Sequence, residues 1–270
     1  MPPIQSLIQP PIQPQPQRRP ATRRLATSAL ALIALGAAFA GFAGSVQAAP
    51  LEEARTPGDF QAIALHGSID LVVSQGAQTA VRVQADDKLL PRVETRVENG
   101  PQGATLQVRL KSAAGLLGSW GSWGGGGDGD RVQVSVVTPR LVAVSSAGSG
   151  DIRVEAFKTP ALRLSLSGAG DVKLEQLATD ELGVHIAGAG DVSGSGRATR
   201  LEVSIAGSGD VALLGLQADD VRVSIAGSGD AAVQAQKTLA VRIAGSGDVS
   251  YSGNPALQSH IAGSGSVTHK

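Results

Sequence analysis

One short pattern recurs seven times between residues 142 and 267, and it constrains the fold more than any other feature of the chain. Each copy contains a Gly-Ser-Gly or Gly-Ala-Gly turn, followed in six copies by an aspartate and in the last by Ser266. These aspartates are Asp151, Asp171, Asp191, Asp210, Asp230 and Asp248. Successive copies are 18 to 20 residues apart. A fixed period of this length is typical of a solenoid, in which similar coils stack on one another.

Apolar and polar residues alternate on both sides of each glycine turn, which is the periodicity of strands with one buried face. The alternation is clear at Leu201, Val203 and Ile205 before a turn, and it resumes at Val211 and Leu213 after it. Each repeat therefore supplies two strands, joined by a tight corner and followed by a looser one. The prediction is an all-β protein, a single-stranded, right-handed parallel β-helix or solenoid with Gly-Ser-Gly-Asp repeats of about 20 residues.

Superposition of the repeats gives three columns of like residues, which we expect to stack in the interior. At roughly 4.8 Å per coil the members of a column would be in van der Waals contact, and each buried aliphatic side chain would contribute roughly 1.5–3 kcal/mol. The predicted columns are Val142, Leu162, Leu182, Leu201, Val221, Leu239 and Leu257; Val144, Leu164, Val184, Val203, Val223, Val241 and Ser259; and Ser146, Leu166, Ile186, Ile205, Ile225, Ile243 and Ile261.

The aspartates of the repeats would form a column of carboxylates about 5 Å apart, which repel one another by on the order of 1 kcal/mol or more. One interpretation is that each carboxylate accepts hydrogen bonds from backbone N–H groups of its own turn, which would offset the repulsion. The alternative is a cation bound along the column, although the spacing differs from that of the nine-residue calcium repeat. We favour the backbone hydrogen bonds and expect no metal, cofactor or catalytic site.

The first 48 residues have the features of an export signal. Residues 1–20 are rich in proline and glutamine and are expected to be disordered. Arg23 and Arg24 then precede an apolar run over residues 29–42, and small residues up to Ala48 complete the pattern of a secretory signal peptide. Twin-arginine export and a retained membrane anchor are alternatives. The run is short for a membrane span, so we expect cleavage and no stable span afterwards.

The rest of the chain is predicted to be a short linker over residues 49–59 and one domain over residues 60–270. Strand patterns punctuated by glycine turns begin with the domain. Residues 86–90 fit one helical turn that ends before Pro91. We expect these strands to form earlier, less regular coils that continue into the seven regular repeats of residues 142–267.

A glycine-rich insertion over residues 112–130 holds both tryptophans of the chain, Trp120 and Trp123. It is expected to be a mobile surface loop. The alternative is that the two indole rings form an apolar contact for a protein, glycan or membrane, because exposed tryptophan is otherwise unfavourable.

Composition and the outward-facing residues argue against several classes of function. The 23 basic and 23 acidic residues cancel, which gives no electrostatic case for nucleic acid as a partner. Without cysteine the chain has no disulfide, thiol nucleophile or lipoprotein anchor. The outward columns contain no carboxylate pair suited to glycoside hydrolysis. His185 and His260 would be roughly 19 Å apart if four coil steps separate them, too far to share a metal or a proton.

Two segments and the repeats together resemble one known family. The segments are Phe60-Gln-Ala-Ile-Ala-Leu-His-Gly-Ser-Ile-Asp-Leu-Val-Val-Ser-Gln-Gly-Ala77 and Asp87-Lys-Leu-Leu-Pro-Arg-Val-Glu-Thr95. With the Gly-Ser-Gly-Asp repeats they resemble the bacterial head GIN domain, labelled an autotransporter adhesin and otherwise a domain of unknown function. The resemblance covers residues 60–270 and implies an exported β-helical protein with no assigned catalytic residues.

We therefore predict an exported, non-catalytic β-solenoid, located in the periplasm or at the cell surface. It would serve as an adhesin-like binding or structural module of the bacterial cell envelope, and its partner would be an envelope or extracellular protein or glycan. The alternative is a carbohydrate-active β-helix enzyme acting on an envelope or extracellular polysaccharide. Self-association through the solenoid ends is a further alternative, because an open end exposes unpaired strand edges.

Overall fold

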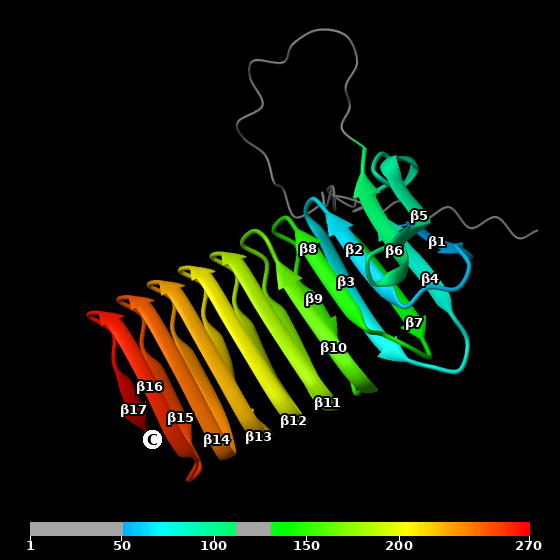
Figure 1. The fold of residues 1–270 in the computed structure, drawn as a ribbon. Helices are drawn as coiled ribbons and strands as arrows, with labels where there is room; N and C mark the ends of the chain where they lie inside the picture. The colour runs from blue at the N-terminus through cyan, green and yellow to red at the C-terminus, as the bar shows by residue number, and fades with distance from the viewer. Residues whose placement is uncertain (1–50, 112–130) are drawn as a thin grey trace, which may run out of the picture. The chain divides into compact units, whose positions relative to one another are not determined.

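A computed structural model describes residues 51–111 and 131–270 (Figure 1). The expected signal peptide and the insertion with Trp120 and Trp123 lie outside the described residues. Within the described ranges, no helix has the length and apolar character needed to cross a membrane.

The C-terminal part of the described chain is the expected parallel β-solenoid (Figure 1). Its long strands pair in parallel in chain order: β10 (Lys158–Leu166), β11 (Val172–Gly188), β12 (Val192–Gly207), β13 (Val211–Gly227) and β14 (Ala231–Gly245). The next coil consists of β15 (Val249–Ser252) and β16 (Ala256–Gly263), which pair with β14, and β17 (Val267–His269) stacks on β15 as the start of a further coil. Strand β11 pairs with β9 (Ile152–Val154) through its first residues and with β10 through the rest, so one continuous strand serves two faces of the solenoid.

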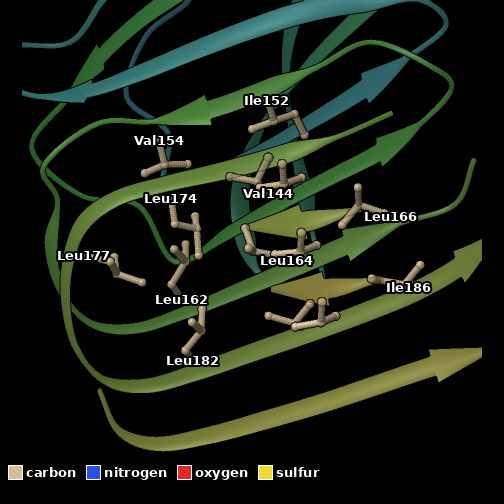
Figure 2. Close-up of a cluster of buried hydrophobic side chains, with 14 of the residues drawn as sticks. Val144, Ile152, Val154, Leu162, Leu164, Leu166, Leu174, Leu177, Leu182 and Ile186 are labelled. Carbon is tan, nitrogen blue, oxygen red and sulfur yellow. The ribbon is translucent and has the colours of Figure 1, made fainter. Parts of the chain in front are cut away.

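The strand register confirms the predicted columns in the regular coils. Leu182 lies beside Leu201, Val184 beside Val203 and Ile186 beside Ile205. The column members from β10 to β14 are buried, with exposed fractions of 3% or less. Figure 2 shows aliphatic side chains from successive coils packed together between the two faces. Stacking of identical positions therefore builds the core, as the period predicts.

One column begins a coil later than predicted. Val142 is half-buried and precedes strand β8 (Ala143–Ala147), whereas Leu141 is fully buried in its place. The segment before β8 is not a strand, so its side chains do not follow the alternation of the repeats. Ala143 and Val144 are both buried, so the regular alternation starts at Val144, within β8.

The N-terminal part contains coils that do not follow chain order. Strand β2 (Ala62–His66) lies between β6 (Gly103–Leu110) and β8. Strand β3 (Ile69–Gln75) lies between β7 (Val132–Thr138) and β9. The later pair β6 and β7 thus stacks outside the earlier pair β2 and β3. Antiparallel pairing adds β4 (Ala80–Ala85) to β7 and β5 (Val93–Gly100) to β6.

The segment predicted as a linker contains strand β1 (Leu51–Arg55), which pairs antiparallel with β4. The Arg55 side chain is largely buried and donates hydrogen bonds to the carbonyl oxygens of Val93 at 2.5 Å and Leu90 at 3.3 Å. These long-range contacts hold β1 in the fold. The predicted helical turn is also corrected: a 3-10 turn covers Leu90–Arg92 and contains Pro91. Proline fits the first positions of a helix because its missing N–H would have no partner there.

Candidate functional site

The glycine corners bring the aspartates of the repeats into one column, in which each carboxylate bridges to the next coil. The Oδ1 atom of each aspartate accepts a hydrogen bond from the backbone N–H at the same position one coil later, at 2.7–3.3 Å. The sequence analysis predicted backbone N–H donors from the same turn. That prediction was wrong, because the observed donor belongs to the next coil. An N–H dipole thus lies between neighbouring carboxylates and offsets their repulsion. We call this column the aspartate ladder.

Asp70 is a seventh aspartate of the ladder that the sequence analysis missed. Its Oδ1 accepts a hydrogen bond from the Asp151 N–H at 2.9 Å, and Ser68 Oγ lies 3.0 Å from Ser149 Oγ. Ile69 occupies the place of the second glycine in the repeat, which hid the match. The signal that remained was a glycine and a serine at the right distance before the aspartate. At the other end, the N–H and Oγ of Ser266 both donate to Asp248 Oδ1.

The corners stack closely enough to exclude side chains. Gly207 has φ of +145°, and a Cβ built on it would lie 2.2 Å from the carbonyl oxygen of Gly188 in the preceding coil. Only glycine fits this position. Among the described residues, no group of three or more His, Asp or Glu side chains could hold a metal ion. The observed contacts of the ladder are those of a structural element that fixes coil spacing.

The broad face formed by β10 to β14 carries a polar hollow of about 280 Å³, which we call the lateral hollow. Its charged lining comes from outward-facing residues of successive coils: Arg163, Glu181, Arg200, Glu202, Asp220 and Arg222. Arg200 forms an ion pair with Glu181, and Thr238 Oγ1 donates to Asp220 Oδ1 at 2.7 Å. Gly183 contributes no side chain between Arg163 and Glu202 in the same column, which leaves room at that point. The hollow therefore offers both cationic and anionic groups to a polar partner.

A second hollow of about 430 Å³ lies beside the aspartate ladder and is lined by Asp151, Asp171, Arg153 and Lys173 among others. Near it, Glu175 Oε1 lies 2.9 Å from Lys173 Nζ and 3.8 Å from Arg153 Nε. The hydrogen bond and positive charge of Lys173 lower the pKa of the Glu175 carboxyl, with a smaller contribution from Arg153. These cations are therefore already partly balanced by carboxylates.

The two histidines considered as catalytic candidates lie in one outward column but far apart. His185 pairs in register with Ser204, which is followed by Ser224, Arg242 and His260. Four coil steps correspond to roughly 19 Å, as predicted. The structure therefore does not bring them together into one site.

A protein-family model matches most of this chain. The profile of the family described as "Putative auto-transporter adhesin, head GIN domain" matches residues 59–255. The chain belongs to the head GIN domain family. No curated protein matches this head GIN domain chain. Its family description is that of an adhesin-like module, in agreement with the resemblance found in the sequence.

Solved structures share the fold of this head GIN domain. A putative adhesin from Bacteroides fragilis is 20% identical, with a TM-score of 0.71 over 82% of this chain and 97% of its own. A putative lipid binding protein from Parabacteroides distasonis is 24% identical, with a TM-score of 0.63 over 83% of this chain and 98% of its own. A putative adhesin from Parabacteroides merdae is 21% identical, with a TM-score of 0.58 over 83% and 97%. At these identities the likeness concerns the fold.

Proposed function

We propose that this head GIN domain is an exported, non-catalytic binding module of the bacterial cell envelope, and that its lateral hollow contacts an extended envelope or extracellular partner. The observation that carries the proposal is the row of charged side chains that successive coils project from one face. Stacked coils suit such contacts because they repeat a surface along one direction. Family membership supports an adhesin-like role, and the arginine-rich start with its apolar run supports export.

The partner that fits the hollow has hydroxyl, amide or mixed charged groups. Arg163 and Arg222 supply hydrogen-bond donors, and Glu181, Glu202 and Asp220 supply acceptors. A partner of uniform negative charge would meet one of these carboxylates in each of three successive coils, β11, β12 and β13. A neutral or mixed-charge glycan, or an extended polar peptide, therefore matches this surface better than a polyanion.

Binding is tested with the purified protein against immobilised envelope polysaccharides and a glycan array. The variant Arg222→Glu reverses a charge in the lateral hollow and is expected to weaken binding about tenfold. The matched control Arg153→Glu reverses a charge beside the ladder, outside the lateral hollow, and is expected to leave binding unchanged. Equal loss in both variants would show that the lateral hollow is not the contact surface.

The alternative of a carbohydrate-active enzyme is tested with the same polysaccharides. Each polysaccharide that binds is incubated with the protein, and release of soluble oligosaccharide is followed by chromatography. We expect binding without release. Any turnover that depends on the intact protein would contradict a non-catalytic role.

Export is tested by fractionating the source cells, where we expect the protein outside the cytoplasm with its N-terminus near Ala49.

A further inference from the structure

The two ends of the solenoid differ in how their edge strands are protected. At the N-terminal end the edge strands are β1 and β5, both paired antiparallel, with charged residues such as Glu52, Glu94 and Arg96. Charged residues on edge strands discourage pairing with other chains. At the C-terminal end, strand β16 is paired with β14, and no other strand of the described chain pairs with it. This second end is an open edge.

The open edge leaves apolar side chains uncovered. Leu257 and Ile261 of β16 are 41% and 38% exposed. Leu239 and Ile243 hold the same columns one coil earlier and are only 1% and 2% exposed. A further layer of structure on β16 would therefore bury the end of the core. All eight residues of β16 are exposed, so the whole strand is accessible to such a layer.

The backbone of β16 is oriented to accept another strand. Just after the end of β16, Ser264 N–H donates to Gly245 O in the preceding coil, so this N–H points back toward β14. Because this direction alternates along a strand, Leu257, Ser259 and Ile261 direct their N–H and C=O groups to the open edge. The residues with inward side chains thus have outward backbone groups available for pairing.

The sequence of β16 is nearly symmetric about Ser259. Two steps away on either side are the aliphatic Leu257 and Ile261, and three steps away are Ala256 and Ala262. The intervening Gln258 and His260 are both polar and carry no acidic group. A strand with this symmetry is complementary to itself when the second copy runs antiparallel.

We propose that the protein forms a dimer in which β16 pairs antiparallel with β16 of a second copy, about a twofold axis at Ser259. Leu257 of each copy then lies opposite Ile261 of the other, and the two Ser259 residues face each other. Pairing of Leu257, Ser259 and Ile261 in both copies forms roughly six main-chain hydrogen bonds. The aliphatic contacts close the exposed end of both cores. Such an interface is isologous, so it closes at two copies and does not propagate into filaments.

The residues that depart from the repeat at this end agree with such a contact. Ser259 replaces the valine or leucine found at its position in the preceding coils, and a small side chain fits where two strands meet on a twofold axis. Ser266 replaces the ladder aspartate, so no carboxylate remains at the open end of the ladder to repel a second copy. Neither Ser259 nor Ser266 has a buried side-chain oxygen without a hydrogen-bond partner. Among the described residues, only the side chain of Ser146 has one.

The dimer is tested by sedimentation velocity of the purified protein over a range of concentrations. Ser259→Asp places two carboxylates against each other at the twofold axis and is expected to weaken association at least about tenfold. Ser259→Asn, similar in size but neutral, is the matched control and is expected to associate nearly as the unaltered protein does. The melting temperatures of both variants in dilute solution should equal that of the unaltered protein, because residue 259 is exposed.

A charge-reversal mixture tests the symmetry directly. Ser259→Lys alone is expected to be monomeric, and mixing it with Ser259→Asp should restore a dimer that contains one copy of each. The proposal is overturned if the unaltered protein stays monomeric at all accessible concentrations, which would leave the edge for a different partner. It is also overturned if Ser259→Asp associates as well as Ser259→Asn, or if open-ended polymers form.

Discussion

At the scale of single residues, Gln176 has a backbone conformation that its side chain opposes. Its φ is +52°, the only positive value among the described residues other than glycine. It lies at the register shift between β11 and β12, at the second corner of its coil. The left-handed conformation costs roughly 1–2 kcal/mol for a residue with a Cβ. Gln176→Gly is expected to raise the free energy of unfolding by up to about 1 kcal/mol in urea titrations, because relief of this strain exceeds the extra chain entropy that glycine loses on folding. Gln176→Ala is the control, and an equal gain from alanine would contradict this explanation.

Ser146 is a second residue whose environment opposes its chemistry. Its Oγ is buried without a hydrogen-bond partner in the described structure, in a column where Leu65 and Leu166 are its neighbours. A buried hydroxyl without a partner costs about 1–3 kcal/mol. Ser146→Ala is therefore expected to raise the thermal midpoint. The neighbouring Ser145→Ala is the control, because Ser145 Oγ donates to Ile63 O at 3.4 Å, and it should give no such gain.

At the scale of elements, the aspartate ladder joins coils through one side-chain acceptor in each. Asp191 Oδ1 accepts the N–H of Asp210 at 2.8 Å, and Asp191→Ala removes that acceptor. The expected loss is about 1 kcal/mol of unfolding free energy. Asp191→Asn keeps an acceptor oxygen and removes one charge from the column, so it should be close to neutral. An alanine variant as stable as the asparagine variant would show that the bridge contributes nothing.

The stacked aliphatic columns should respond far more strongly than the ladder. Ile205 is 1% exposed in the middle of its column, and Ile205→Asp buries an unpaired carboxylate there. We expect a loss of at least about 4 kcal/mol, seen as unfolding or as separation of the coils on either side. The adjacent and exposed Ala206→Asp is the control. Circular dichroism and proteolysis would detect the change.

The strand register of the regular coils was predictable from the sequence, because every repeat contains the same glycine turn. Alignment of the glycine turns alone places Leu201 beside Val221 and Ile205 beside Ile225, and this is the register that β12 and β13 adopt. The sequence of the N-terminal part has no regularly repeated glycine turn that could be aligned in this way. Strand periodicity shows that Leu106 is buried but not that β6 lies outside β2, since neighbour choice depends on long-range packing. The place of β1 likewise depends on Arg55 and its distant carbonyl acceptors. In the candidate site, the columns of outward residues were predictable, whereas the ion pair between Arg200 and Glu181 in the hollow required side-chain positions.

At the scale of the whole molecule, the ladder offers a test of cation binding. Each ladder aspartate already has Oδ1 engaged by a backbone N–H, so we expect the thermal midpoint to be the same in chelator and in added calcium. A cation that binds only the folded protein would raise the midpoint with concentration. Such a rise, abolished in Asp191→Asn, would establish the alternative of a cation along the column.

The direction of the aspartate ladder bears on how this protein changes in length over evolution. Every coil offers one carboxylate to its successor and one N–H to its predecessor, so the bonds all run the same way along the stack. Duplication or deletion of a whole coil leaves each remaining donor and acceptor with a match. Gain or loss of a few residues breaks the match at once. Relatives should therefore differ by whole coils, and their contact surfaces should lengthen or shorten in steps of about one coil, or roughly 4.8 Å.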